Sequence, residues 1–398
     1  MLDIGQVHRM EYELGADRSV QIVMAEAPGR IHFLGEKIEN DTGIYLSAAI
    51  DRYINVAISA RKDNSIRFYA ADLGERKRST LVNLKYRRED RWANYLKTAI
   101  YLFVEMGIPV KGLNFSMCGN IPQQVGLASS TAIEAAAAAA LRSFYHVQIS
   151  DAELSQKLHD SHAAFFGSAL DPADYQICLM ARKDQFLYVD ASLLEVEKIK
   201  SPLSRFSIII VDSRVPRFGV ETELNQRRDD TLKGLKLLTD KRDGTSFKDF
   251  ASTDLLEMLG DFPERIRRRT MHIVQEIHRV YDARDALKRR ALASFSKIIF
   301  HSHESLRDLY ETSCPEIDWL IKRAQELEGV AGSRMTGQGF GGCTYTIIRK
   351  ELAEEYKKRL EEYERIFGFR PVIYDVKIGG GARVLPQKRR THANTADK

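Results

Sequence analysis

The chain has 398 residues, of which 44% are hydrophobic and 29% charged, so it is long enough for more than one hydrophobic core. No apolar run reaches the roughly eighteen residues that a membrane helix needs, and the first residues lack the pattern of a signal peptide. The 60 basic and 55 acidic residues leave a net charge of +5, without a broad basic stripe for nucleic acid. We therefore expect a cytoplasmic protein with no membrane or nucleic-acid partner, present as a monomer or small homo-oligomer.

The four cysteines are spread along the chain with no paired spacing. Such spacing argues against a disulfide framework and against a zinc site. We expect reduced packing residues at Cys118, Cys178, Cys314 and Cys343.

The first half of the chain has the pattern of a mixed α and β lobe. Short apolar runs bounded by Gly, Pro and Asn fill residues 21–60 and indicate a β-rich opening. Helical spacing of apolar residues follows at 95–106, 133–144 and 151–166, the last of these after a cap at 150 or 151.

The pattern changes in the second half. An apolar strand at 206–211 is followed by long helical stretches that continue to residue 327, and Pro315 suits the first turn of the last helix. The change places a boundary near 195–203. We predict two lobes and a disordered basic tail, with ranges 1–198, 199–385 and 386–398.

The segment 119–134 carries the strongest functional signal. A turn of small residues runs directly into a helix-forming stretch with six consecutive alanines. Unpaired backbone N–H groups and the positive end of a helix dipole meet there, which suits a phosphate. The alternative is a simple cap, in which Ser129 or Ser130 accepts the first amide hydrogens. The turn lacks the lysine of a Walker loop. The candidate phosphate-binding residues are Gly126, Leu127, Ala128, Ser129, Ser130 and Thr131.

A second glycine-rich segment lies at 337–342. It matches the glycine spacing of a dinucleotide-binding loop, but an apolar strand follows it where that motif requires a helix. The glycines therefore indicate a close backbone approach or a tight hairpin.

Taken in order, the segments 27–36, 119–132 and 332–343 resemble the three signature motifs of the GHMP small-molecule kinases, with galactokinase as the closest branch. Further segments at 211–228, 302–318 and 380–384 are similar to galactokinases in the same order. The resemblance implies an α+β, two-lobed GHMP kinase fold. The N-terminal lobe would be mixed α/β, and the C-terminal lobe a ferredoxin-like α+β lobe with added helices.

The resemblance also implies a catalytic pair. Aligned through Gly167, the segment 167–180 puts Asp174 at the position of the galactokinase base and Arg30 at that of its arginine. A cation beside a partly buried carboxylate keeps it charged at neutral pH. The alternative is structural, with Asp171 and Asp174 as turn and cap residues and Arg30 in a surface ion pair.

The substrate pocket departs from the galactokinase pattern. Lys37, Glu39 and Asn40 stand where that signature has His, Asp and Tyr. Asp171 replaces a glycine that lies against galactose, and Leu224 replaces a tyrosine, so substrate specificity is predicted to differ. Glu36 is expected to recognise a hydroxyl or to form a salt bridge. The candidate substrate-binding residues are Glu36, Lys37, Glu39, Asp171, Leu224 and Gly339.

The expected metal site also departs from the pattern of the superfamily. The position of the Mg²⁺-binding glutamate in this superfamily falls on His162, although magnesium prefers oxygen ligands. Ser130 is the other candidate ligand, with Asp160 as an alternative to His162 if the helix shifts.

Together these features predict an ATP- and Mg²⁺-dependent kinase that phosphorylates a hydroxyl of a small sugar. The resemblance implies the anomeric hydroxyl and leaves open whether the sugar is galactose. The alternative is a kinase-derived sensor that binds sugar or nucleotide with little or no transfer. Acid or amine substrates, as in mevalonate or homoserine kinases, are a weaker alternative.

Overall fold

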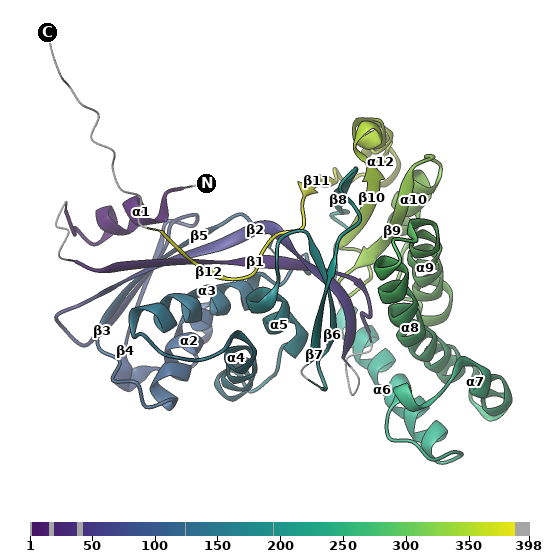
Figure 1. Cartoon of the computed structure of the whole chain (residues 1–398), viewed down its shortest axis with the longest axis horizontal. Helices are drawn as coiled ribbons and strands as arrows, with labels where there is room; N and C mark the ends of the chain where they lie inside the picture. Colours follow the sequence, from purple (N-terminus) through teal and green to yellow (C-terminus); the bar gives the residue numbers. More distant parts are fainter. Residues whose placement is uncertain (1, 16–19, 38–42, 124, 194, 387–398) are drawn as a thin grey trace, which may run out of the picture.

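The computed structural model describes residues 2–15, 20–37, 43–123, 125–193 and 195–386. Two sheets lie side by side along the long axis of the molecule (Figure 1). The first has eight strands, in the order β12-β1-β2-β5-β3-β4 with β6 paired to β2 and β7 to β6. The second has four strands, in the order β11-β8-β10-β9. Of the predicted substrate-site positions, Glu39 lies outside the described residues, as does 387–398 of the predicted tail.

Long strands at the start of the chain form the centre of the first sheet and confirm the predicted β-rich opening. β1 and β2 pair antiparallel, with Met24 opposite Ala57. The sheet consists of β1 (Ile22–Leu34), β2 (Ile44–Ala60), β3 (Ser65–Ala70), β4 (Glu75–Thr80), β5 (Leu113–Gly119), β6 (Gln185–Asp190), β7 (Glu195–Lys200) and β12 (Arg383–Leu385).

Helices cover both faces of this sheet. α1 (Ile4–Glu11) lies on one face, and the other is covered by α2 (Ala93–Glu105), α3 (Ser129–Phe144), α4 (Asp151–Phe166) and α5 (Pro172–Met180) (Figure 1). The alanines at 135–140 are fully buried, because their small side chains let α3 lie close against β1 and β2. The predicted helix at 151–166 is confirmed, capped by Ser150, whose hydroxyl accepts from the Glu153 amide at 3.1 Å.

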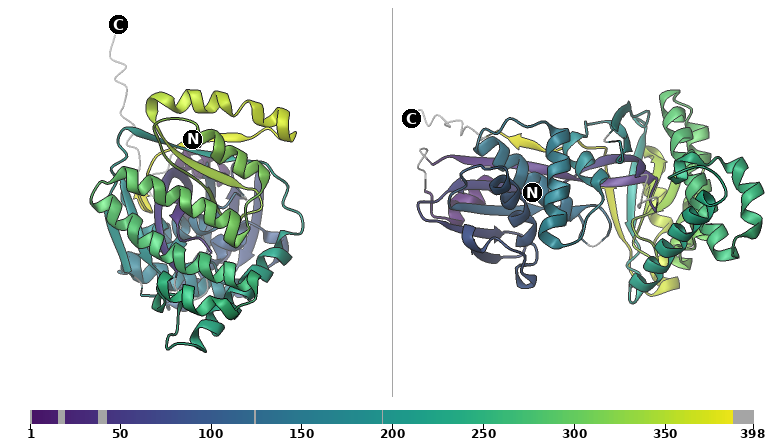
Figure 2. Two further views of the ribbon diagram at one scale, coloured as in Figure 1. Left: turned by 90° about the vertical axis from the view of Figure 1, so that its right-hand side faces the viewer. Right: turned by 90° about the horizontal axis from the view of Figure 1, so that it is seen from below.

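The second sheet has the ferredoxin-like order. Its strands are all antiparallel and comprise β8 (Phe206–Asp212), β9 (Val330–Thr336), β10 (Cys343–Arg349) and β11 (Val372–Val376). Helices join β8 to β9 and β10 to β11, and in the view along the long axis several of them cover this end of the molecule (Figure 2). They are α6 (Val220–Thr239), α7 (Ser252–Met258), α8 (Glu264–Lys288), α9 (Leu292–Ser305), α10 (Pro315–Gln325), α11 (Ala353–Arg359) and α12 (Glu362–Phe367).

The remaining helical segments are short turns of other helix types. One π-helical turn follows α9, and the rest are 3-10 turns: η1 (Leu81–Asn83), η2 (Arg88–Asp90), η3 (Phe247–Asp249), η4 (Leu259–Asp261), η5 (Leu306–Tyr310, π) and η6 (Lys350–Leu352). No helix in the described part of the chain has the length and apolar character needed to span a membrane.

The end of the described chain returns to the first sheet. β12 pairs antiparallel with β1, with Met24 opposite Leu385, and Arg383 donates to Glu26 at 2.8 Å. The range 199–385 predicted for the second lobe therefore includes a strand of the first sheet. Three residues with no apolar alternation carry too little local signal to predict that pairing.

A buried ionic network joins the two sheets. Arg334 of β9 donates to Glu36, which follows β1, at 2.7 Å and to Glu276 of α8 at 3.2 Å. Glu276 also accepts from the Gly35 amide at 3.0 Å. All three charged side chains are at most 7% exposed, so the network fixes the second sheet against the end of β1.

Candidate active site

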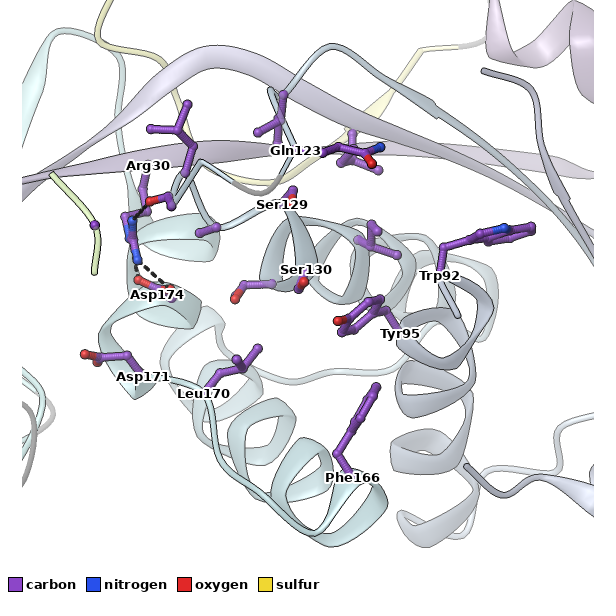
Figure 3. Close-up of a pocket in the computed structure, with 18 of the residues that line it drawn as sticks. Arg30, Trp92, Tyr95, Gln123, Ser129, Ser130, Phe166, Leu170, Asp171 and Asp174 are labelled. Carbon is purple, nitrogen blue, oxygen red and sulfur yellow. Dashed lines mark hydrogen bonds and ion pairs between the residues drawn. The ribbon is translucent and has the colours of Figure 1, made fainter. Parts of the chain in front are cut away.

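A cavity of about 1200 Å³ lies between the helices below the first sheet and the edge of the second sheet. Its lining residues follow one another across the site (Figure 3). Trp92, Tyr95 and Phe166 lie at one end, Ser129 and Ser130 at the start of α3 lie in the middle, and the other end holds Arg30, Asp171 and Asp174. We call these the aromatic end and the carboxylate end.

Arg30 and Asp174 form a two-pronged ion pair at the carboxylate end. Arg30 Nε donates to Asp174 Oδ1 at 2.5 Å and Nη2 donates to Oδ2 at 2.9 Å. A third donor, Arg30 Nη1, bonds to the carbonyl of Gly126. The side chains are only 11% and 9% exposed, which excludes the alternative of a surface ion pair. Asp174 lies in the first turn of α5, so this helix directs its carboxylate at β1.

His32 is a further partner of Asp174. Its Nε2 lies 3.2 Å from Asp174 Oδ1, and its Nδ1 lies 2.6 Å from the Ser47 hydroxyl. Its ring stacks on Tyr45 with centroids 4.5 Å apart. No sequence motif singled out His32, although it lies two residues after Arg30 on one strand and therefore faces the same side.

The two neighbouring aspartates are held in different protonation environments. Burial alone would raise the pKa of Asp174, but Arg30 and His32 outweigh it and lower that pKa to about 2. Burial and the charge of Asp174 raise the pKa of Asp171. Asp171 caps α5 by accepting from the Ala173 amide at 2.9 Å, and the Tyr45 hydroxyl also donates to it. Asp171 therefore has the predicted capping contact as well as a place in the cavity wall.

The start of α3 is open to the cavity. Ala128 is the N-cap, in the left-handed region with φ of 59°, and it has no side-chain capping bond. The helix begins at Ser129, so neither predicted serine occupies the cap position. All six predicted phosphate-binding residues of the serine loop, residues 126–131, line the cavity. The N–H groups of the first turn thus face a space large enough for a ligand.

The glycine loop, residues 337–342, approaches the serine loop closely, and a close backbone approach is one of the two roles predicted for its glycines. A Cβ at Gly126 would lie 3.1 Å from the Cα of Gly337. Gly337 and Gln338 line the cavity, and the Gly337 amide donates to Glu36. Gly339 and Leu224 are not among the described residues of the cavity wall. Gly339 instead packs on Thr312, whose carbonyl oxygen would lie 2.7 Å from an added Cβ, and Leu224 is half-buried on α6.

The carboxylate of Glu36 is fully engaged. It accepts from Arg334 at 2.7 Å, from the Thr336 hydroxyl at 3.0 Å and from Gly337. This geometry favours the salt-bridge alternative over hydroxyl recognition. Lys37 lines the cavity, and its Nζ donates to the Gln338 carbonyl at 2.8 Å.

The residues predicted as metal ligands beside Ser130 point elsewhere. His162 Nδ1 lies 2.7 Å from Glu134 Oε1, while the Tyr175 hydroxyl donates to the other oxygen of Glu134 at 2.6 Å. His162 is 3% exposed, and the side chain of Asp160 is 63% exposed on the outer surface of α4. Of these predicted ligands only Ser130 lines the cavity within the described chain, so the residues present do not fit the expected metal-ligand set.

One sheet with helices lies beside a ferredoxin-like sheet, and one cavity holds both the start of α3 and the buried pair of Arg30 and Asp174. This is the architecture expected of a small-molecule kinase of the GHMP class. Sequence comparison agrees: residues 94–182 match the GHMP kinases N terminal domain, residues 283–365 match GHMP kinases C terminal, and residues 11–60 match the galactokinase galactose-binding signature. The chain belongs to the galactokinase-like branch of the GHMP kinases and is a sugar kinase.

Similar proteins cover nearly the whole chain. A putative galactokinase of Treponema pallidum is 37% identical, over 91% of this chain and 92% of its own length. Galactokinase of Bacillus subtilis is 31% identical, over 90% and 93%. The crystal structure of Lactococcus lactis galactokinase complexed with galactose superposes with a TM-score of 0.87 at 26% identity, over 96% of this chain and 100% of that one. The predicted two-lobed fold and family are therefore confirmed.

Proposed function

We propose that the protein transfers the γ-phosphoryl group of ATP to a hydroxyl of a small sugar that binds at the carboxylate end, by analogy to galactokinases the anomeric hydroxyl. The observation that carries this proposal is the buried pair of Arg30 and Asp174, with Nε and Oδ1 2.5 Å apart, in one cavity with the open start of α3. Phosphoryl transfer depends on such positioning and on charge stabilisation more than on covalent chemistry.

The nucleotide is assigned to the other two parts of the cavity. The rings of Tyr95 and Phe166 stack with centroids 5.2 Å apart and, with Trp92, offer flat apolar surfaces for a base. The phosphates then reach the N–H groups and hydroxyls of the serine loop at the positive end of α3.

Asp174 is assigned to the acceptor hydroxyl. Because its pKa is lowered to about 2, it is a carboxylate at any physiological pH and accepts a hydrogen bond from that hydroxyl. A carboxylate with so low a pKa is a weak base, so its first role is to orient the hydroxyl, whose proton it accepts as the new bond to phosphorus forms. Arg30 keeps the carboxylate in place through both oxygens.

A bound Mg²⁺ ion would neutralise negative charge on the phosphates during phosphoryl transfer. Of the predicted ligands, Ser130 alone lines the described cavity.

The test is ADP release with Mg·ATP over a panel of aldoses, amino sugars and sugar acids that includes galactose. Asp174→Asn should lower kcat on the preferred sugar by about 100-fold or more, because the amide cannot accept the proton. Asp160→Asn removes an exposed carboxylate of α4 outside the cavity wall and should leave kcat unchanged. Equal turnover in the wild type and Asp174→Asn would overturn the role of Asp174.

A sugar or nucleotide sensor is the second candidate. The observation that favours it is the burial of His162 against Glu134 at the position where the family has a metal ligand. Tight ATP binding with no ADP release on any sugar of the panel would establish this alternative in place of the kinase.

A further inference from the structure

Three nearly parallel rings connect the aromatic end of the cavity to the protein interior. The rings of Tyr95 and Phe166 have centroids 5.2 Å apart, and both residues line the cavity (Figure 3). The ring of His162, one turn before Phe166 on α4, stacks on Phe166 with centroids 4.3 Å apart. The three ring planes lie within 26° of one another. We call Tyr95, Phe166 and His162 the ring stack.

His162 also contacts the helix that begins at the serine loop. Its Nδ1 lies 2.7 Å from Oε1 of Glu134 on α3. Glu134 follows Ser130 by four residues, so the two side chains lie on the same face of the helix, with Ser130 in the cavity wall and Glu134 fully buried. The hydrogen bond therefore joins the ring stack to the helix whose first turn faces the cavity.

Burial makes this hydrogen bond a strong constraint. His162 is 3% exposed and Glu134 is 0% exposed. A hydrogen bond in a low-dielectric interior is stronger than one in water, and the loss of one partner leaves the other unsatisfied. The Tyr175 hydroxyl is a second donor to Glu134, at 2.6 Å, but the ring of Tyr175 packs against His159, outside the ring stack. Of these two donors, His162 is the one that connects Glu134 to the ring stack.

We propose that His162 is a positioning residue for the nucleotide, which holds the ring stack for the base at a fixed spacing from the serine loop for the phosphates. This inference rests on the proposed function, because it concerns the nucleotide assigned to these two parts of the cavity. A nucleotide binds more tightly than its separate parts only where the two subsites are held at a matching distance. His162 is not among the described residues of the cavity wall, so it acts through Phe166 and Glu134.

The test is calorimetric binding of ATP, adenosine and inorganic tripolyphosphate to the whole protein in the presence of Mg²⁺. Adenosine probes the ring stack alone, and tripolyphosphate probes the serine loop alone. His162→Phe keeps a ring on Phe166 but removes the hydrogen bond to Glu134. It should raise the Kd of ATP about tenfold, the loss expected for one buried hydrogen bond, and leave the Kd of adenosine and of tripolyphosphate unchanged.

A second variant separates the ring of His162 from its hydrogen bond. His162→Asn keeps an N–H group near the position of Nδ1 but has no ring to stack on Phe166. It should raise the Kd of adenosine about threefold or more and leave that of tripolyphosphate unchanged. Because Glu134 keeps a partner in this variant, it tests the inference even where His162→Phe does not fold. An unchanged Kd of adenosine would overturn the inference.

Tyr175→Phe is the matched control. It removes the other hydrogen bond to the same buried carboxylate without changing the ring stack, and it should leave the Kd of all three ligands unchanged. An unchanged Kd of ATP in His162→Phe would overturn the inference. A loss for ATP that adenosine or tripolyphosphate alone reproduces would also overturn it, because His162 would then serve one part of the site. Equal losses in Tyr175→Phe and His162→Phe would assign the effect to Glu134 as a structural residue and overturn the inference too.

This inference and the proposed kinase fail in different ways. If a sugar is turned over, His162→Phe should raise the KM for ATP and leave kcat at saturating ATP and the KM for the sugar unchanged. A lower kcat with an unchanged KM for ATP would keep the kinase and overturn the positioning role. The expected pattern of Kd values without ADP release on any sugar would keep the role of His162 and overturn the kinase. A wild-type protein that does not bind ATP would overturn both.

Discussion

At the scale of single residues, the site depends on how many donors a buried carboxylate receives. Asp174 has two from Arg30 and one from His32, and its pKa falls to about 2 despite burial. Glu134 has only His162 and Tyr175, and burial raises its pKa. Charged partners therefore decide the direction in which the pKa of a buried acid moves, and of these two acids Asp174 lines the cavity.

We expect His32 to act as a positioning residue for Asp174. Its Nε2 donates to Asp174 when Nδ1 accepts from the Ser47 hydroxyl, 2.6 Å away. His32→Leu removes this donor and should lower kcat about tenfold with little effect on the KM for ATP. His32→Gln offers an amide N–H in a similar place and should recover most of the loss. Steady-state kinetics of both variants test this, and equal rates for Leu and Gln would point to a purely structural ring.

At the scale of elements, the serine loop and the glycine loop lie against each other through backbone atoms, because glycines occupy the point of contact. An added Cβ at Gly126 would lie 3.1 Å from the Cα of Gly337, and Ala128 adopts a left-handed conformation so that α3 begins at the cavity. These contacts bring the serine loop of the first sheet's helices to the glycine loop of the second sheet. Phosphate binding at the serine loop therefore depends on the close approach of the glycine loop as well as on the helix dipole.

The glycine at 339 is explained by packing. Its φ is +95°, and an added Cβ would lie 2.7 Å from the Thr312 carbonyl oxygen. Gly339→Ala should lower the free energy of unfolding by about 3 kcal/mol through strain and collision together. Gly368→Ala, with φ +76° and nothing within 4 Å, should cost about 1 kcal/mol from strain alone. Urea unfolding of both variants separates the two terms, and equal losses would contradict the collision with Thr312.

At the scale of the whole molecule, the ionic network of Arg334, Glu36 and Glu276 fixes the second sheet against the first. Burial would raise the pKa of Glu276, but Arg279 and Arg334 lower it from 4.5 to about 2. Breaking such a buried pair leaves an uncompensated charge, whereas the intact network is near break-even against apolar packing. We infer that its main effect is to specify one arrangement of the two sheets.

This network makes the free energy of unfolding depend on pH. Because the pKa of Glu276 is lower in the folded state, the unfolded chain binds its proton more readily, and stability is lost as pH falls from 4.5 toward 2. The contribution of Glu276 to the free energy of unfolding should drop by about 2 kcal/mol between pH 7 and pH 3. Urea unfolding at the two pH values, compared with Glu276→Gln, measures this drop.

The expected result is a smaller pH effect in Glu276→Gln than in the wild type. Glu355→Gln, which removes a carboxylate that is 50% exposed, should keep the wild-type dependence. A wild-type dependence in Glu276→Gln would show that other carboxylates cause the acid sensitivity.

The amino-acid sequence by itself determined the features that local patterns encode. Ordered motifs predicted the family, the two-lobed fold, the serine loop and the pairing of Arg30 with Asp174. Apolar periodicity predicted α2, α3, α4 and α10 within about four residues and gave no bounds for the other helices. The predicted helix began at residue 133, four residues after the observed start of α3 at Ser129. The small residues of the loop show no apolar periodicity that could indicate the earlier start.

The tertiary structure decided which distant groups meet. Glu36 and Arg334 are 298 positions apart, so no local sequence pattern shows that the Glu36 carboxylate is paired with Arg334. The same holds for Glu134 with His162 and for β12 beside β1. The side chain available to bind a ligand depends on the partners it already has, and those partners are set by how the two sheets pack.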